Sequence, residues 1–185
     1  GITRFDIQKA YEAITKQASD TTTGNRYRPG INNYIKSGYI PDDKKGNYFV
    51  YGSAATTLEY TYADWCIGML AKKLGKTDDA EKYLKRADFY KNIFDTKTGF
   101  IRPRLANGKF YEPFDPATTC GEFGPKDCWA GGRGFVEGSA WHYTFMVPHG
   151  QKELIGLMGG QKKYKQKLDT LFEKGYYNMA NEPDI

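Results

Sequence analysis

One acidic residue stands among aromatic side chains in the C-terminal third of the chain. In "FVEGSAWHYTFMVPH", residues 135 to 149, Glu137 lies close in sequence to Phe135 and Trp141. Apolar rings around a carboxyl group favour its protonated form, which suits a proton donor. Glu137 also lies at or just before the start of a predicted helix, where the helix dipole favours the ionised form. From the residues alone, a proton donor and an ordinary helix-start carboxylate both remain open.

The neighbouring polar side chains do not complete a familiar metal or nucleophile site. His142 and His149 are seven residues apart, and Pro148 would end a helix before both could share its face, which argues against a zinc pair. Ser139 lacks the G-x-S-x-G setting of a hydrolase nucleophile. The residues therefore favour neither a zinc pair nor a hydrolase triad.

The three cysteines divide into one helical residue and one pair in a loop. Cys66 lies in an apolar helical pattern and is predicted to be buried. Cys120 and Cys128 flank a loop that contains glycine and proline, close enough in sequence to form a disulfide. Both a bridge and a pair of free thiols fit this spacing.

Three further charged residues have either a structural or a ligand-binding interpretation. Asp64 precedes Trp65 within a predicted helix. Its carboxylate is interpreted either as exposed on the helix surface or as part of a ligand-binding site. Arg102 and Arg104 straddle Pro103 in an extended segment, so their guanidinium groups are expected on one face. Pairing with acidic neighbours is favoured over a ligand clamp.

Helices must position these residues. Residues 77–94 carry a helical stripe with Thr77 as the expected N-cap, and a wider stripe before it ends at Gly75, so the two form an αα-hairpin. The wider stripe comprises Leu58, Tyr62, Trp65, Met69, Leu70 and Leu74. Further helices are predicted near residues 6–18, 138–147, 151–158 and 161–174. The fold class is all-α.

Two long connections separate the predicted helices. Residues 19–53 and 95–136 are rich in Gly, Pro and Asn but too aromatic for disordered linkers. Within the second, Asn107-Gly108 predicts a hairpin turn. Ordered loops at one end of a helical array commonly carry the binding site.

The charge and the aromatic content of the chain limit the classes of partner that are expected. The chain of 185 residues has 27 basic and 22 acidic side chains, a net charge of only +5, so nucleic acid is not an expected partner. Aromatic residues make up 16% of the chain, which suits carbohydrate because sugar C–H faces stack on rings. No run approaches the roughly 20 apolar residues of a membrane span, and no leader precedes Gly1, although a removed signal peptide would leave no trace.

A binding module without catalysis is the alternative to an enzyme. The segment "ADWCIGMLAKKLGKTDDAEKYLKRA" is similar in spacing to a tetratricopeptide unit. Only one such unit is visible, whereas a helical solenoid needs about three to be stable.

Several motifs in order resemble glycoside hydrolase family 92, the calcium-dependent exo-α-mannosidases. They are "TLEYTYADWCIGMLAKKLG", "YKNIFDTKTGFIRPRLANGKFYEPFDP", "VEGSAWHYTFMVPH" with "LIGLMGG", and "NEPDI". The resemblance covers the chain from about Tyr39 onward. It implies an (α/α)6 barrel beside an N-terminal β-sandwich, with residues 1–185 as one partial segment of that barrel.

The resemblance also implies roles for individual residues. Glu137 corresponds to the general acid of an inverting mechanism. The general-base aspartates belong downstream of "NEPDI", so the chain alone is expected to be inactive and, with unpartnered helix faces, to self-associate. The implied substrate-binding residues are Asp64, Trp141, His142, Asn181 and Glu182.

Some positions depart from the family pattern. Ser139 replaces the more usual Asn, His142 the usual Gln, Ala63 the usual Asp and Phe145 a usual Trp. Some α-1,2-specific members have His at the position of Asn181, which leaves linkage open, although α-1,2 is favoured.

The family's cofactor is Ca²⁺, for which Glu182 is the expected ligand in this chain, with Asn181 and Asp184 as further oxygen donors. The implied substrate is a mannose-containing oligosaccharide from mannan or N-glycans. The expected location is periplasmic, cell-surface or secreted, in a bacterium.

Overall fold

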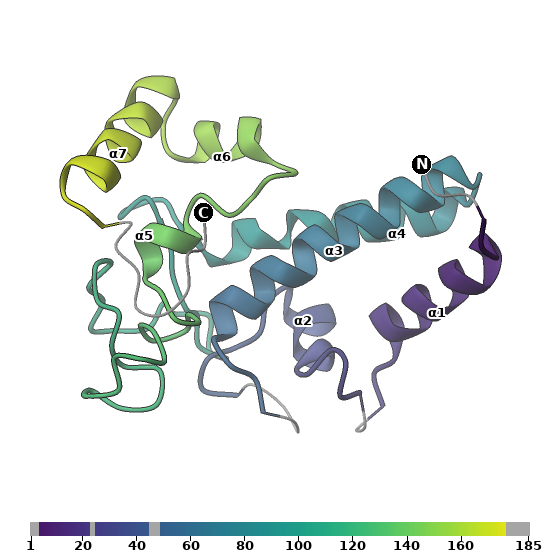
Figure 1. Ribbon diagram of the computed structural model, residues 1–185, viewed down its shortest axis with the longest axis horizontal. Helices are drawn as coiled ribbons and strands as arrows, with labels where there is room; N and C mark the ends of the chain where they lie inside the picture. Colours follow the sequence, from purple (N-terminus) through teal and green to yellow (C-terminus); the bar gives the residue numbers. More distant parts are fainter. Residues whose placement is uncertain (1–3, 23–24, 45–48, 177–185) are drawn as a thin grey trace.

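The computed structural model describes residues 4–22, 25–44 and 49–176. Within them the chain is mainly helical, with one short β-hairpin, as the sequence predicts (Figure 1). The elements are α1 (Ile7–Ser19), α2 (Ile31–Ser37), α3 (Ser53–Lys73), α4 (Thr77–Ala87), the 3-10 helix η1 (Asp88–Ile93), β1 (Phe94–Asp95), β2 (Phe100–Ile101), α5 (Ala140–Tyr143), α6 (Gln151–Leu157) and α7 (Gln161–Glu173).

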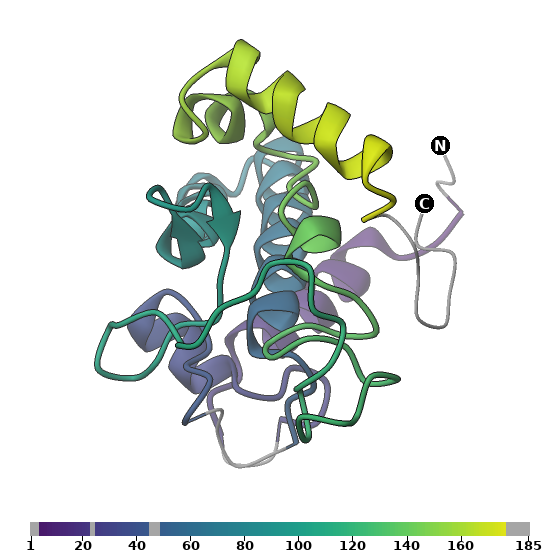
Figure 2. The same ribbon diagram turned by 90° about the vertical axis from the view of Figure 1, so that its left-hand side faces the viewer.

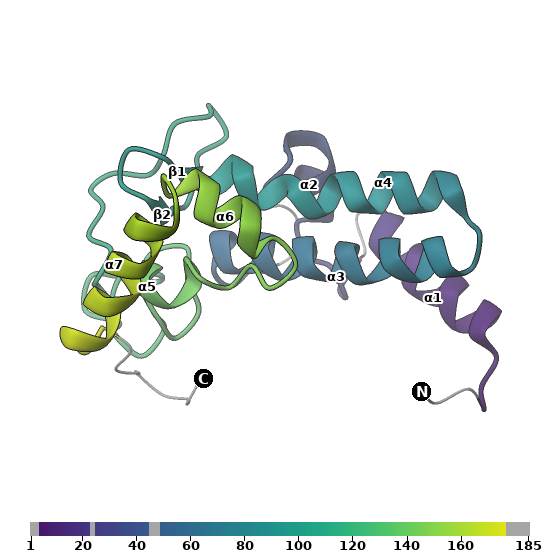
Figure 3. The same ribbon diagram turned by 90° about the horizontal axis from the view of Figure 1, so that it is seen from above.

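The hairpin of α3 and α4 forms the centre of the molecule and confirms the predicted αα-hairpin. Figure 3 shows the two helices side by side, with α1 crossing near one end and α6 and α7 above the other. Gly75 makes the turn with a φ of 71°, a conformation that glycine adopts without steric cost. Thr77 is the first residue of α4, and Lys76 occupies the N-cap position expected for Thr77.

The apolar stripe of α3 is only partly buried. Met69 is 44% exposed, as expected for a helix face without its partners, and Tyr62 is 41% exposed. Leu58, expected on the same unpartnered face, is instead buried, and Cys66, expected in the core, is exposed. The face against α4 carries small or polar side chains because the two helices approach closely there. Asp64 and Gly68 contact Arg86 and Leu84 of α4, and Ala71 packs in one cluster with Ala80 and Tyr83.

Two other helices differ from the prediction. Helix α2 lies inside the segment predicted as loop, and this seven-residue helix buries Ile31 and Tyr34 before it ends at Gly38, whose φ is 76°. Helix α5 covers only Ala140–Tyr143 instead of continuing to Val147. Beyond Thr144 the backbone forms short-range turns instead of helical hydrogen bonds. Helices α1, α6 and α7 match their predicted ranges to within about two residues.

The second long connection is ordered by short-range pairing. Strands β1 and β2 are antiparallel, with Phe94 opposite Ile101, and the predicted turn at Asn107-Gly108 lies within a hairpin closed by a bridge between Arg104 and Phe110. Arg102 pairs with Asp95 at 2.8 Å and with Glu112, so pairing with acidic neighbours is confirmed for it.

Arg104 has different partners from Arg102. Its guanidinium group donates to the carbonyl oxygens of Asn92 and Gly108. It contacts no carboxylate among the described residues, so the expected pairing does not extend to it.

The main hydrophobic core lies below α6 and α7, where the β-hairpin, α5 and the start of α3 meet (Figure 2). A second cluster joins α1, α3 and α4, and a third surrounds α2. Across the described ranges, every helix is too short or too polar to traverse a lipid bilayer.

Close packing of α3 on α4 can be tested with two glycines. A Cβ atom added at Gly68 would lie 2.8 Å from Leu84 Cγ, whereas one added at Gly156 in α6 would meet nothing within 4 Å. We expect Gly68→Ala to lower the free energy of unfolding by about 1–3 kcal/mol through overpacking. The matched Gly156→Ala should raise it by about 0.5–1 kcal/mol, because alanine favours the helix. Urea unfolding of both variants checks this, and equal effects would contradict the tight interface.

Candidate active site

Glu137 occupies an unusual backbone conformation. Its φ is 51°, and it is the one non-glycine residue with positive φ among those described. The left-handed region costs a residue with a Cβ roughly 1–2 kcal/mol. The backbone amide of Glu137 donates to the carbonyl oxygen of Ala130 at 3.0 Å. The chain therefore holds this half-buried carboxyl group in a fixed and strained turn.

The loop around Glu137, residues 130–139, is closed by backbone hydrogen bonds. The amide of Gly132 donates to the carbonyl oxygen of Gly138 at 2.8 Å. The carbonyl oxygen of Gly134 accepts from the amides of Ala54 and Ala55 at 2.9 and 3.1 Å. Those amides belong to the first turn of α3, where helical donors lack helical partners. The loop thus caps α3.

Two buried carboxylates hold the loop in place, and no sequence pattern predicts either of them. Glu122, 3% exposed, accepts from the amides of Gly52 at 3.1 Å and Gly134 at 2.7 Å. Asp42, also 3% exposed, accepts from Ser53 Oγ and from Arg133 Nε at 2.6 Å. Both residues lie in segments without periodic pattern.

Tyr51 lies beside the same turn. Its hydroxyl donates to the carbonyl oxygen of Ala130, the atom that also accepts from the amide of Glu137. Burial raises the pKa of the Tyr51 hydroxyl, and the nearby Glu137 carboxylate raises it further. Tyr51 therefore stays protonated and supports the turn as a hydrogen-bond donor.

Ser139 and His142 form one capping pair at the start of α5. The amide of Ser139 donates to His142 Nδ1 at 3.0 Å, and the serine hydroxyl is 3.0 Å from the same nitrogen.

A hollow of about 460 Å³ opens beside His142 and is lined by Glu59, Tyr143, Phe145 and Met146 as well. Nε2 of His142 is buried and has no hydrogen-bond partner within the described ranges. Its ring also lies close to Gly138, next to Glu137. The structure thus places the His142 ring beside Gly138, the residue after Glu137, and it places Glu59 of α3, an exposed carboxylate, at the same hollow.

Asp64 has a buried environment that excludes the exposed-carboxylate interpretation. Its carboxylate accepts from Arg28 at 2.9 Å, from Arg86 Nε at 2.6 Å and from the Tyr34 hydroxyl at 3.0 Å. The side chain is 0% exposed. Burial and the Asp64 charge raise the pKa of Tyr34, which therefore donates. These contacts explain Asp64 as a structural ion pair, and its predicted contact with sugar stays a prediction.

Trp141 packs into the main core. It is 8% exposed, meets Phe100 edge to face at 4.8 Å and stacks on Tyr176 at 4.8 Å. Nζ of Lys167 lies 3.2 Å from the Phe100 ring centre and 4.9 Å from that of Trp141. Burial lowers the pKa of Lys167 to about 8. The observed contacts of Trp141 are packing contacts, and its substrate role remains a prediction.

Asn181 and Glu182, together with Asp184, lie outside the described residues. Within the described ranges, no group of three His, Cys, Asp or Glu side chains is arranged to hold a metal ion. The described part of the chain therefore does not supply a calcium site of such side chains.

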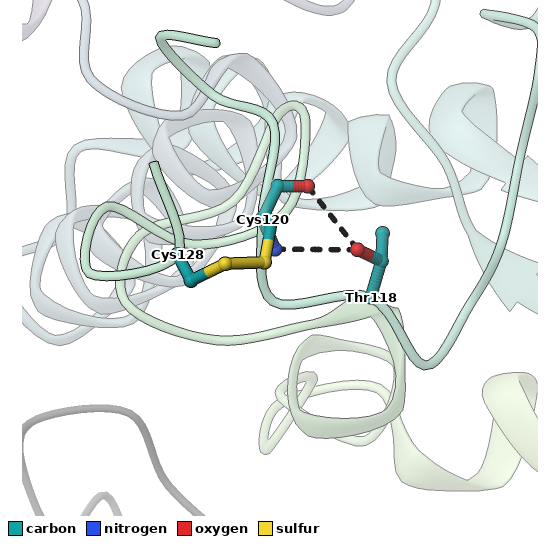
Figure 4. Close-up of a disulfide and its surroundings, with 3 residues drawn as sticks. All are labelled: Thr118, Cys120 and Cys128. Carbon is teal, nitrogen blue, oxygen red and sulfur yellow. Dashed lines mark hydrogen bonds between the residues drawn. A yellow bond between two sulfur atoms is a disulfide. The ribbon is translucent and has the colours of Figure 1, made fainter. Parts of the chain in front are cut away.

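The disulfide between Cys120 and Cys128 is present, which confirms the bridged alternative (Figure 4). The hydroxyl of Thr118 bonds to both the amide and the carbonyl oxygen of Cys120 at 3.2 Å. The bridge closes the loop that carries Glu122, so it restrains one support of the Glu137 turn.

Comparison with known proteins gives one matching family. The model of the glycosyl hydrolase family 92 catalytic domain matches residues 1–185. A protein of Arthroderma benhamiae, described as an uncharacterized secreted glycosidase, is 32% identical over 98% of this chain and 25% of its own length. The chain thus spans about a quarter of that relative.

Two solved structures from Bacteroides thetaiotaomicron are similar. One, an α-mannosidase of family GH92 in complex with mannoimidazole, has a TM-score of 0.78 and 32% identity over 93% of this chain and 21% of that chain. The other, an inverting mannosidase of family GH92, has a TM-score of 0.75 and 35% identity over 92% of this chain and 21% of that chain. The fold class, helical hairpins similar to part of an (α/α)6 barrel, is confirmed.

The role of Asp64 can be decided by an isosteric change. Asp64→Asn leaves the buried Arg86 and the partly buried Arg28 without their counter-charge, so we expect the free energy of unfolding to fall by about 3–5 kcal/mol. Glu81→Gln, an exposed carboxylate on α4, is the control and should change it by less than about 0.5 kcal/mol. Chemical denaturation measures both. A stable Asp64→Asn protein with weakened sugar binding would instead support a direct substrate contact.

Proposed function

Because the chain belongs to glycoside hydrolase family 92, we propose that it is part of an enzyme that removes terminal α-linked mannose from mannan or N-glycans. The observation that carries this proposal is the Glu137 turn, a strained carboxyl position supported by two buried carboxylates. The similar solved structures support the substrate class, since both are mannosidases. Because the chain belongs to this family, an enzyme is favoured over the alternative of a tetratricopeptide-like binding module without catalysis.

Glu137 is the proposed general acid. In an inverting reaction, the acid protonates the oxygen that leaves, while a separate carboxylate activates water on the opposite face of the sugar. The product would be β-mannose. The turn holds the Glu137 backbone through Ala130, so the carboxyl group approaches the substrate from one direction.

The base is proposed to lie outside this chain. The family resemblance implies a position after "NEPDI", and the chain spans about a fifth to a quarter of the length of its relatives, which supports this proposal. We therefore propose that the chain is one segment of a longer protein with an N-terminal β-sandwich and the rest of the barrel.

The proposal also covers the glycosidic linkage that is cleaved, the metal ion that is bound and the location of the protein. We propose α-1,2 specificity, Ca²⁺ held by Glu182 with Asn181 or Asp184 and by residues beyond this chain, and a location outside the cytoplasm. The description of the fungal relative as secreted supports that location, and so does the disulfide. Hydrolysis of α-1,2-mannobiose to β-mannose, lost with a chelator and restored by Ca²⁺, tests these points on the full-length protein.

The general-acid role predicts a separation of binding from turnover. In the full-length protein, Glu137→Gln should keep mannoside affinity and lower kcat by about 10²–10⁴, because the amide has the same shape but donates no acidic proton. Glu137→Gly should abolish turnover as well but raise stability by about 1 kcal/mol, because glycine adopts positive φ without strain. Glu81→Gln serves as the control. Unchanged turnover of Glu137→Gln would leave Glu137 as an ordinary carboxylate.

The isolated chain is predicted to self-associate without activity. Tyr62 and Met69 of α3 are 41% and 44% exposed, which leaves an apolar helix face available to another copy. A chain without its base should show no measurable mannosidase activity. Sedimentation and a turnover assay with Ca²⁺ on the 185-residue chain check both statements. A monomer as active as the full-length protein would contradict the missing-base argument.

A further inference from the structure

Four aromatic side chains from two loops form a strip on the surface beside the Glu137 turn. This aromatic strip consists of Phe49, Tyr51, Phe123 and Trp129. Phe49, Phe123 and Trp129 are 72%, 44% and 61% exposed. Phe123 lies at the centre, with ring centres 5.7 Å from Phe49, 5.2 Å from Tyr51 and 5.8 Å from Trp129. Exposed rings gathered in this way commonly mark a binding surface.

The strip is built on fixed backbone. The disulfide between Cys120 and Cys128 encloses Phe123, and the Tyr51 hydroxyl is bonded to Ala130, the residue after Trp129. The backbone that carries Phe123 and the side chain of Tyr51 are therefore restrained before any ligand arrives, which lowers the entropic cost of binding.

A hollow of about 510 Å³ continues from the strip, and Phe123 belongs to both. The hollow combines the rings of Tyr111 and Phe114 with polar groups of Asp115 and Arg133. Arg133 lies over the Tyr111 ring at 5.2 Å, and its Nε bonds to Asp42. Rings for C–H faces and charged groups for hydroxyls are the combination that sugars require.

The aromatic strip and the proposed acid share one hydrogen-bond acceptor. The carbonyl oxygen of Ala130 accepts hydrogen bonds from both the Tyr51 hydroxyl and the Glu137 amide. An enzyme that removes one terminal unit leaves the remaining oligosaccharide to extend from the acid across an open surface. The strip and its hollow provide such a surface next to Glu137.

We propose that the aromatic strip and the adjoining hollow bind the sugar units on the leaving-group side of the substrate. This inference rests on the proposed mannosidase function. It assigns Phe123 and Trp129 as specificity-determining residues that favour oligosaccharides over short substrates.

The test compares substrates of different length on the full-length protein. The double variant Phe123→Ala/Trp129→Ala should lower kcat/KM for a mannopentaose by roughly tenfold or more, since two ring contacts are lost. For α-mannosyl fluoride, whose leaving group reaches no ring, kcat/KM should change by less than about twofold. Trp129→Tyr should restore part of the oligosaccharide activity. Tyr27→Ala removes another exposed ring, 75% exposed and outside the strip, and should change neither.

The outcomes are distinct. Equal losses on both substrates with a lower melting temperature would show that the rings pack against another part of the protein, and no loss on either would leave the strip without a role; both overturn the proposal. If the wild-type protein hydrolyses no mannoside, the proposed function fails by itself. Tryptophan fluorescence with soluble α-mannan then tests the strip: a change that disappears in Trp129→Phe supports sugar binding, and no change overturns it.

Discussion

The carboxylate of Asp64 is shared by partners from three other parts of the chain. Arg86 comes from α4, Tyr34 from α2 and Arg28 from the segment between α1 and α2. Arg86 also donates to the carbonyl oxygen of Ala18 at 2.9 Å, which adds the end of α1. Two arginines and a tyrosine offset the desolvation of one buried charge only if all of them are in place. The positions of four helices are therefore mutually dependent.

The same helix, α3, connects this network to the proposed acid. Asp64 lies in its middle, and its first turn donates to Gly134 in the loop that carries Glu137. The part of α3 between Asp64 and the first turn is held by its own backbone hydrogen bonds, so a shift at one end of the helix also moves the other end. The strained φ of Glu137 persists because backbone bonds, Glu122 and Asp42 determine the loop around it.

Periodic segments were predictable from sequence, and the polar supports were not. The apolar spacing of residues 77–94 and 161–174 located α4 and α7, because amphipathic faces repeat with the helical period. The same rule placed Cys66 in the core, although its side chain is exposed, because hydrophobicity alone does not say which helix face has a partner. Glu122 supports the site through backbone amides of Gly52 and Gly134, and such contacts leave no pattern in the sequence. Glu137 itself stood out by its aromatic neighbours, but its role came from family resemblance.

Main-chain atoms hold the Glu137 turn, through Ala130, Gly132, Gly134 and Gly138. Side chains at other positions of the loop are then less constrained than the glycines, provided that local pairs such as Ser139 and His142 change together. Over evolutionary time, a lineage can alter the side chains around the Glu137 carboxyl group while the backbone of the turn stays where it is. Sequence drift in this loop would change the surface around Glu137 without dismantling the turn itself.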